Sequence, residues 1–422
     1  MNEFKYRGDV LYCENVLVRG VAAGAGTPFY LYSQKTLENH FLAFDSAFNA
    51  VPHMTCYSVK ANSNLSLIKL FSDLGSGLDV VSGGEIFRAL RAEVSPEKIV
   101  YSGVGKTRAE IEYALDFNIL MFNVESPQEL GLIDSVAKGM GKKARVALRV
   151  NPDVDPKTHP YISTGLKENK FGIRIEDAMD EYKRAARMKN IEVAGVDCHI
   201  GSQLTETGPF VDAIAKVKGF VGALIKEGMD IRYLDIGGGL GITYDKEIPP
   251  SPEEYADAVI EGIGTLPCTL ILEPGRVIVG NAGMLVTRVL YTKKAEEKNF
   301  IIVDAGMNDL VRPSLYGAYQ GILPVNKKEG KKIIADIVGP ICETGDFLAK
   351  GREMPDFEQD DYIAVKSAGA YGFTMSSNYN SRPKIAEVLV NGAEYFIVRE
   401  RETYEDLIRH EEVPVHLKKA GE

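Results

Sequence analysis

Long apolar runs are absent from this sequence of 422 residues. No run approaches the roughly 18 apolar residues that a membrane-spanning helix requires. The first nine residues are too polar to form a secretory signal peptide. We therefore expect neither a membrane protein nor an exported one, and no membrane partner.

Cysteine is also scarce. The five cysteines are Cys13, Cys56, Cys198, Cys268 and Cys342. They are odd in number, far apart and without Cys-x-x-Cys spacing, so they match neither a disulfide framework nor a zinc site. This usage favours a reducing compartment, and we expect a cytoplasmic protein without a metal site.

An excess of positive charge is missing as well. Forty-nine basic residues stand against 59 acidic ones, and the net charge is −10. Because this field repels a phosphate backbone, we expect no nucleic-acid partner. What the sequence does contain is 45% apolar residues, enough for a large core. The length predicts two or three domains.

Short β-branched runs alternate with helical patterns through the middle of the chain. The eight runs cover residues 54–60, 78–82, 99–103, 120–125, 146–151, 193–200, 233–239 and 270–275. Near-continuous apolar strands are typical of a parallel sheet covered on both faces, and eight of them close a (β/α)8 TIM barrel. An open doubly wound sheet is the alternative. One helix is marked by Ser251, Pro252 and Glu254, which predict a capping box.

The pattern changes after residue 282. Strands are predicted at residues 284–290, 300–304, 333–338, 362–365, 387–390 and 394–398. Their two-residue alternation, without long helices between them, favours an antiparallel β-sandwich or barrel. Strand-like runs at 10–12 and 16–18 are expected to join it. We therefore predict a barrel domain over residues 29–282 and a β domain over residues 1–28 and 283–422.

Polar residues gather where the predicted barrel strands end, which is where the active sites of such barrels lie. Lys60 closes the first strand. A lysine at a strand end often only reaches the rim. Inside a barrel mouth, however, its amine is desolvated. Desolvation lowers the pKa of an amine, and the neutral amine can form a Schiff base.

Glycines follow the last two predicted barrel strands. Gly237, Gly238 and Gly239 come after the seventh strand, and Gly275 with Arg276 after the eighth. A glycine cluster alone is a weak signal, because any tight turn uses it. Barrels frequently bind phosphate with these two loops, however. An imine-forming lysine and a phosphate loop are what pyridoxal phosphate requires.

Three further side chains suit that cofactor. Glu273 ends the eighth strand, where it either forms a structural salt bridge with Arg276 or another neighbour, or keeps a proton on the pyridine nitrogen. His199 is either a hydrogen-bonded core residue or a ring that lies flat against the cofactor, with Ser202 near the phosphate. The sequence therefore predicts a pyridoxal phosphate site at the mouth of the barrel.

Motifs along essentially the whole chain carry a resemblance. In the barrel they are Tyr-Ser-Val-Lys60-Ala-Asn, His199-Ile-Gly-Ser-Gln, Gly237-Gly-Gly and Glu273-Pro-Gly-Arg276. Further on they are Asp304-Ala-Gly-Met-Asn-Asp-Leu-Val-Arg312-Pro-Ser-Leu-Tyr316, Gly339-Pro-Ile-Cys342-Glu343-Thr-Gly-Asp346, and Gly369-Ala-Tyr371 with Met375-Ser-Ser-Asn-Tyr-Asn-Ser-Arg-Pro. In these motifs the chain resembles the pyridoxal-phosphate-dependent decarboxylases with an alanine-racemase-type barrel, and among them the diaminopimelate decarboxylases.

The resemblance implies an activity and a set of roles. The activity is decarboxylation of meso-2,6-diaminopimelate to L-lysine and CO₂, the last step of lysine biosynthesis, through an external aldimine and a quinonoid intermediate. Lys60 would be the Schiff-base lysine, and Cys342 would protonate the carbanion, with His199 as the third catalytic residue. The other cofactor-binding residues would be Ser202, Gly237, Gly238, Gly239, Glu273, Pro274, Gly275, Arg276 and Tyr371. Substrate would be bound by Arg276, Arg312, Tyr316, Glu343 and Tyr371.

Alternatives remain open at this stage. Cys342 could be a small buried hydrophobic residue. The substrate could instead be ornithine, arginine or carboxynorspermidine, and the chain could be a non-catalytic cofactor-binding regulator or an alanine racemase. The resemblance also implies a homodimer with shared active sites. The connection at residues 152–171, about 20 residues long, is expected to act as an active-site lid.

Overall fold

The computed structural model describes residues 2–154, 170–295 and 298–418. It separates into two compact units. The barrel unit comprises Gln34–Ala282 and Gly369–Thr374, together with the first residues of the chain. The β unit comprises Glu3–Ser33, Gly283–Ala368 and the described part of the chain after Met375.

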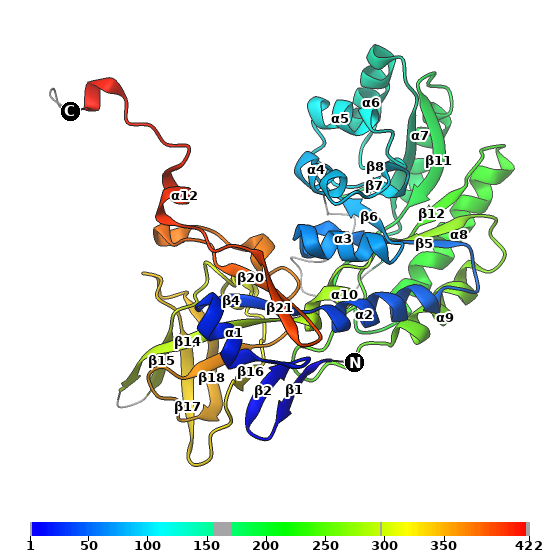
Figure 1. Cartoon of the computed structure of the whole chain (residues 1–422). Coiled ribbons are helices and arrows are strands. Elements are labelled where there is room, and N and C mark those ends of the chain that lie inside the picture. Colours follow the sequence, from blue (N-terminus) through cyan, green and yellow to red (C-terminus); the bar gives the residue numbers. More distant parts are fainter. Residues whose placement is uncertain (1, 155–169, 296–297, 419–422) are drawn as a thin grey trace. The chain divides into compact units, whose positions relative to one another are not determined.

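The barrel unit is built on a closed parallel sheet (Figure 1). Its strands are β5 (His53–Ser58), β6 (Gly77–Val80), β7 (Ile99–Tyr101), β8 (Met121–Val124), β9 (Ala144–Asn151), β11 (Ile191–Asp197), β12 (Tyr233–Asp235) and β13 (Thr269–Leu272). Each strand pairs with the next in this order, including β8 with β9, and the last strand, β13, pairs with the first, β5. The sheet is therefore closed. The predicted (β/α)8 barrel is confirmed, and the open sheet is excluded. A short strand, β10 (Ile173–Arg174), adds to β9.

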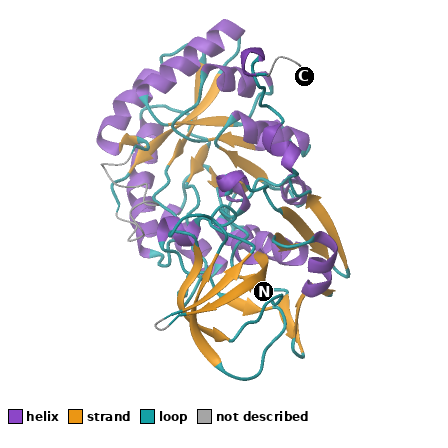
Figure 2. Ribbon diagram, turned by 90° about the vertical axis from the view of Figure 1, so that its left-hand side faces the viewer, coloured by secondary structure: helices purple, strands orange, loops and turns teal. Residues whose placement is uncertain are grey.

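Helices surround this sheet (Figure 2). They are α2 (Gln34–Ala47), α3 (Leu65–Asp73), α4 (Gly83–Arg91), α5 (Arg108–Asp116), α6 (Pro127–Met140), α7 (Ile175–Ala185), α8 (Gly208–Lys226), α9 (Pro252–Ile263) and α10 (Arg276–Val279). Side-chain caps start several of them, because the first turn of a helix leaves amide groups without partners. The capping box predicted at Ser251 and Glu254 is confirmed at the start of α9.

The β unit holds the remaining elements. Its strands are β1 (Phe4–Arg7), β2 (Val10–Cys13), β3 (Val16–Leu17), β4 (Phe29–Ser33), β14 (Gly283–Lys294), β15 (Asn299–Val303), β16 (Ile322–Pro324), β17 (Lys332–Val338), β18 (Phe347–Pro355), β19 (Tyr362–Val365), β20 (Ala386–Asn391) and β21 (Glu394–Arg399). Its helices are α1 (Val18–Ala25), α11 (Arg312–Tyr316) and α12 (Tyr404–Ile408). β1, β2 and β3 form a small sheet, and the other strands form a larger one.

The larger sheet differs from the sequence-based expectation in two ways. Most of its pairs are antiparallel, but β15 pairs with β17 and β4 pairs with β20 in parallel. β4 was expected to begin the barrel domain, yet it lies between β14 and β20 in this sheet. All five of its residues are buried there, so the boundary between the units falls after Ser33 rather than after residue 28.

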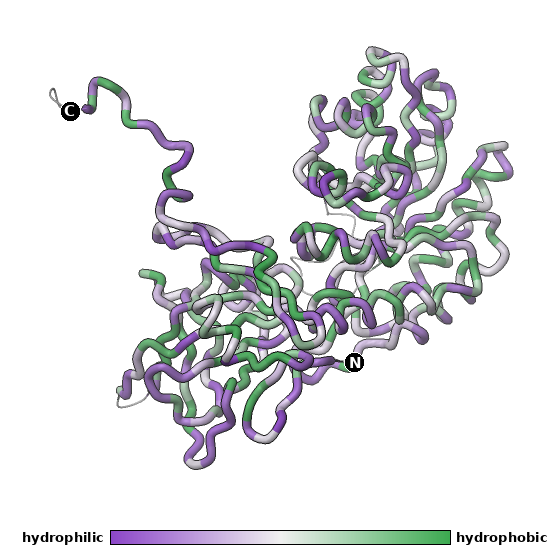
Figure 3. Tube along the Cα trace, in the orientation of Figure 1, coloured by the Kyte–Doolittle hydropathy of each residue, from purple (hydrophilic) through white to green (hydrophobic). Residues whose placement is uncertain are grey.

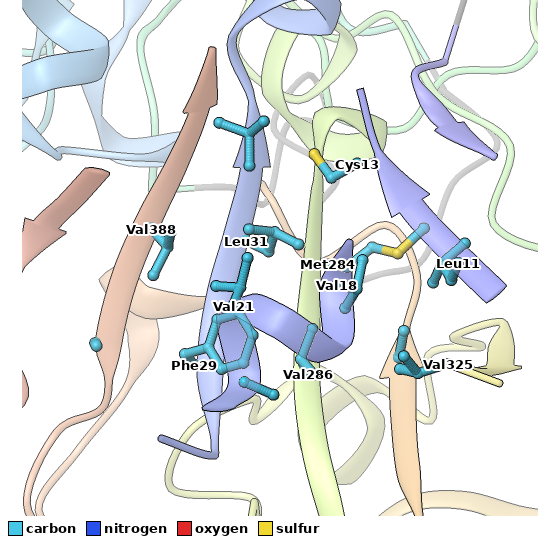
Figure 4. Packing of buried hydrophobic residues seen from close by; sticks show 14 residues of the cluster. Leu11, Cys13, Val18, Val21, Phe29, Leu31, Met284, Val286, Val325 and Val388 are labelled. Carbon is cyan, nitrogen blue, oxygen red and sulfur yellow. The ribbon is translucent and has the colours of Figure 1, made fainter. Parts of the chain in front are cut away.

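The β unit has its own apolar core (Figure 4). Leu11 and Cys13 of β2 pack with Val21 of α1, and with Met284 and Val286 of β14. Residues from both ends of the chain thus share one core, as expected for the N-terminal runs. The run predicted as a strand at 16–18 is shorter, because α1 already begins at Val18.

Two further expectations concern the rest of the chain. Most of the connection predicted to be a lid, residues 155–169, lies outside the described residues. Among the helices that the structure describes, none combines the length and the apolar character needed to cross a bilayer.

Candidate active site

Lys60 lies at the end of the first barrel strand, in a 3-10 turn (Val59–Ala61) that follows β5. Its Nζ donates to Asp79 Oδ2 at 2.6 Å. Asp79, on the neighbouring strand β6, is fully buried, and its Oδ2 also accepts from Ser58 Oγ at 2.8 Å. A buried carboxylate and a lysine amine therefore form an ion pair at the mouth of the barrel.

The electrostatics of Lys60 correct one prediction. Burial alone favours the neutral amine, as expected from the sequence. The carboxylates of Asp79 and Glu273 outweigh that effect and raise the pKa of Lys60 above its usual value. The expected lowering of the pKa was therefore wrong, because the sequence pattern did not reveal Asp79 as a partner.

Glu273 directly follows β13 and is buried among other polar groups. Its Oε1 accepts from Ser102 Oγ at 3.2 Å and from Asn123 Nδ2 at 3.4 Å. Burial, followed by the nearby charges of Asp235 and Asp79, raises the pKa of Glu273 well above its usual range. The positive charge of Lys60 counteracts part of this rise.

The glycine segment after β12 is shaped by its neighbours. Gly237 and Gly239 have φ angles of 66° and 118°, in the left-handed region that favours glycine. A Cβ on Gly238 would lie 2.2 Å from the main-chain oxygen of Glu273, and one on Gly239 would lie 2.6 Å from that of Gly201. Only glycine fits here, and the backbone itself forms the surface of this loop.

Arg276 connects several candidate residues. It donates to Ser202 Oγ at 3.1 Å and to the hydroxyl of Tyr244 at 2.6 Å. Its guanidinium lies 4.7 Å from the centre of the Tyr371 ring. The Tyr371 amide donates to the Ala61 oxygen at 2.8 Å, which places this residue beside the Lys60 turn.

His199 lies next to the glycine segment. A Cβ on Gly237 would approach the Cβ and Cγ atoms of His199 to 2.9 Å. Burial, followed by the charges of Arg149 and Lys60, lowers the pKa of His199 well below its usual value. The ring is therefore neutral at physiological pH, and its Nδ1 accepts from the amide of Gly201 at 3.2 Å.

The other candidate residues lie in the β unit. Arg312 is buried at the start of α11, and Tyr316 ends the same helix. Ser314, between them, donates through Oγ to the Gly345 oxygen at 2.6 Å. This bond ties α11 to the turn that carries Cys342 and Glu343. The Cys342 side chain is exposed, which removes the alternative of a buried hydrophobic residue.

The turn at Cys342 and Glu343 is held by a second segment. The Cys342 amide donates to Asn380 Oδ1 at 2.8 Å, and Glu343 hydrogen-bonds the hydroxyl of Tyr379. Asn380 adopts a left-handed conformation with a φ of 55°. The β unit therefore brings a cation, a carboxylate and a thiol into one neighbourhood.

Comparisons with known proteins agree with this chemistry. Residues 34–280 match the family described as "Pyridoxal-dependent decarboxylase, pyridoxal binding domain". The curated diaminopimelate decarboxylase of Aquifex aeolicus is 52% identical over 407 residues, which cover 96% of each chain. That of Vibrio cholerae is 51% identical over 409 residues, covering 96% of this chain and 98% of the relative.

The chain belongs to the diaminopimelate decarboxylases. Among solved structures, the diaminopimelate decarboxylase from M. jannaschii in co-complex with L-lysine has a TM-score of 0.94 and 40% identity, covering 98% of this chain and 99% of that one. The enzyme from Helicobacter pylori complexed with L-lysine has a TM-score of 0.90 and 45% identity, covering 93% and 98%. The chain therefore shares both sequence and fold with these relatives over nearly its full length.

The barrel mouth fits pyridoxal phosphate, the cofactor of this family. Lys60 supplies an amine, Glu273 a buried carboxyl group, and the glycine segment a bare backbone for a phosphate. Two buried acceptor atoms, Asp79 Oδ1 and Asn123 Oδ1, receive no hydrogen bond from the described residues. Polar atoms of this kind are rarely left buried unless a ligand or water meets them.

Several polar side chains near the site were not predicted from the sequence. Asp79, Ser102, Asn123 and Asp235 all point their polar groups into the network around Lys60 and Glu273. Arg149, at the end of β9, donates to Glu125 Oε1 at 2.8 Å. Each of these residues is polar and lies in an otherwise apolar run that was predicted to be a buried strand. Because a buried polar side chain needs a partner, its position in such a run could have indicated it.

Proposed function

We propose that this chain decarboxylates meso-2,6-diaminopimelate at its D-centre and forms L-lysine and CO₂, the last step of lysine biosynthesis. The observation that supports the proposal is the hydrogen bond of Ser314 to Gly345, which joins the helix that carries Arg312 to the turn that carries Glu343. The far end of diaminopimelate bears one carboxylate and one ammonium group, which match these two charges. Ornithine and arginine end in a lone cation and offer no carboxylate to Arg312.

The barrel residues hold the cofactor. Pyridoxal phosphate, when bound, supplies an electron sink for the electron pair that CO₂ leaves behind. Lys60 would hold it covalently until the substrate amine replaces the lysine. Glu273 would hold a proton at the ring nitrogen, and the neutral His199 ring would lie against the cofactor ring. The backbone of residues 237–239 and 274–276, with Ser202, would bind the phosphate.

The remaining residues bind substrate and move a proton. Arg276 and Tyr371 would contact both cofactor and substrate, since they lie together beside the Lys60 turn. Arg312 and Tyr316 would bind the distal carboxylate, and Glu343 the distal ammonium. The Cys342 thiol would then deliver its proton to the carbon that has lost CO₂, which is consistent with its exposed side chain.

We also propose a cytoplasmic homodimer with two shared sites. Apolar side chains are exposed on β21 and on the C-terminal segment, which mixes hydrophobic and hydrophilic residues (Figure 3). They are Tyr395, Phe396, Ile397, Tyr404, Ile408, Val413, Val415 and Leu417. Exposed apolar surface of this extent is typical of an interface. Each site would take Lys60 from one protomer and Cys342 from its partner.

Substrate comparison tests this function. The kcat/KM of the holoenzyme is measured on meso-2,6-diaminopimelate, ornithine and arginine, with Lys60→Ala as the inactive control. Losing one charge-assisted contact costs about 1.5–3 kcal/mol, or about one to two powers of ten. We expect diaminopimelate to be preferred by at least that factor. Comparable values for ornithine would contradict the proposal.

A further inference from the structure

Asp235 is a buried carboxyl group that the roles above do not use. It ends β12, next to the strand that Glu273 follows, and none of its surface is exposed. Its Oδ1 accepts from the amide of Gly237 at 2.9 Å, and its Oδ2 accepts from Asn123 Nδ2 at 2.9 Å. Asp235 and Glu273 lie close enough for each to affect the pKa of the other.

Asn123 brings the two carboxyl groups together. The same Nδ2 group that donates to Asp235 also lies 3.4 Å from Glu273 Oε1. The main chain of Glu273 is fixed as well, because its amide donates to the Gly237 oxygen at 2.8 Å and its oxygen accepts from Ser58 Oγ at 3.0 Å. The Glu273 side chain therefore starts from a fixed main-chain position, beside Ser102 and Asn123.

Two adjacent buried carboxyl groups do not both ionise, since like charges in a low dielectric repel strongly. Asp79 on β6 and Asp197 on β11 add negative charge, and Lys60 adds positive charge. Burial raises the pKa of Asp235 to about 6, while hydrogen bonds from Asn123 and Gly237 counteract part of that rise. The hydrogen bonds from Gly237 and Asn123 stabilise the anionic form of Asp235. The proton that the two carboxyl groups share therefore resides on Glu273.

We propose that Asp235 is a positioning residue whose negative charge keeps the carboxyl group of Glu273 protonated and which, through their shared partner Asn123, holds that group toward the ring nitrogen of pyridoxal phosphate. When pyridoxal phosphate binds, the O–H bond of Glu273 would break and an N–H bond would form on the ring, whose positive charge would then offset the second carboxylate. Glu273 is left as a carboxylate that Ser102 and Asn123 stabilise. The inference rests on the role of Glu273 in the proposed function.

The test compares two ligands on cofactor-free protein. One is pyridoxal phosphate, and the other is its analogue with a C–H group in place of the ring nitrogen. Dissociation constants are measured by absorbance. Wild type should prefer pyridoxal phosphate, and Asp235→Asn should lower that preference about tenfold or more. Asparagine keeps an acceptor for the Gly237 amide but loses the charge that holds the proton.

Two controls make the comparison specific. Asp336→Asn removes a buried acid of the β unit whose Oδ1 also accepts from a glycine amide, that of Gly351, and should leave the preference unchanged. In a Glu273→Gln background, Asp235→Asn should have no further effect on the preference, because the two residues act as a unit. Should Asp235→Asn fail to fold by circular dichroism, Asn123→Ala, which removes a donor to Asp235, should lower the preference in the same direction.

Each contrary outcome has a distinct meaning. An equal loss of affinity for both ligands would mean that Asp235 acts only through Gly237, and would overturn the proposal. A wild-type preference that survives in Asp235→Asn would overturn it too. If wild type showed no preference for the ring nitrogen, the assignment of Glu273 in the proposed function would fail first.

Discussion

Asp79→Asn is expected to destabilise the cofactor-free protein through Lys60. The substitution keeps the size of the side chain and an acceptor for Ser58, but it removes the charge that pairs with the Lys60 amine at 2.6 Å. Asp79 is fully buried, whereas 31% of the Lys60 side chain is exposed. The carboxylate is therefore desolvated, and the amine is partly screened by water.

The magnitude follows from these two environments. A hydrogen bond between charged groups contributes about 1.5–3 kcal/mol, and solvent at Lys60 reduces that value. The negative charge of Asp79 also repels that of Glu273 and so raises the Glu273 pKa. Removing the Asp79 charge relieves this repulsion and therefore restores part of the lost stability. We expect the free energy of unfolding to fall by about 1–2 kcal/mol.

Urea unfolding, followed by circular dichroism, measures the effect. The matched control is Asp73→Asn, which removes a surface partner from Lys69 at the same 2.6 Å, with exposures of 61% and 44%. Water screens an exposed pair of this kind, so Asp73→Asn should change the free energy of unfolding much less than Asp79→Asn. The Lys60 pKa is raised, so the Lys60–Asp79 pair is fully present below the unfolded pKa of about 10.4 and is lost only as the pH rises through the folded pKa. The Asp79→Asn effect should thus be the same at pH 7 and pH 9. Equal effects of the two substitutions would refute the reasoning.

Three further predictions follow from the same geometry. Glu343→Gln should lower kcat/KM on diaminopimelate about 10- to 100-fold, whereas Glu353→Gln, whose carboxylate is surface-exposed on β18, should leave it unchanged. The pKa of His199 is lowered in the folded protein, so below about pH 6.5 only the unfolded protein binds a proton at this residue, and the free energy of unfolding falls. We therefore expect His199→Gln to lose less stability than wild type between pH 7 and pH 5, by up to about 1.4 kcal/mol per pH unit. Urea titrations of the cofactor-free proteins measure this difference. Mixing the inactive Lys60→Ala and Cys342→Ala proteins under subunit exchange should restore about a quarter of wild-type activity. Half of the dimers are then mixed, and each mixed dimer has one complete site out of two. No recovery despite verified exchange would contradict the shared site.

The barrel could be predicted from the sequence because its strands are buried on both faces. Such strands are near-continuous apolar runs, and each predicted run overlaps an observed strand from β5 to β13. β4 could not be placed in the same way. Its residues Phe29–Ser33 are equally apolar, but their partners β14 and β20 lie some 250 to 360 residues away, and local pattern carries no information on such pairing.

The site was predicted in part for a related reason. Lys60, Glu273 and the glycine segment stand at strand ends and within motifs, where their residue types are conspicuous. Asp79 and Asn123 lie inside strands, and only the closed barrel shows that β6 and β8 turn these side chains toward Lys60 and Glu273. The pKa of Lys60 was misjudged for this reason, since it depends on charges from other strands.

Trapping with borohydride tests the central claim most directly. Reduction of the holoenzyme fixes the covalent link between a lysine and pyridoxal phosphate as a secondary amine, which peptide mass mapping then locates. Lys106 is the internal comparison, because it is also buried but donates to Glu129 and to two backbone oxygens. The cofactor mass should appear on the peptide that contains Lys60 and be absent from Lys60→Ala. Its appearance on Lys106, or on no lysine, would contradict the account.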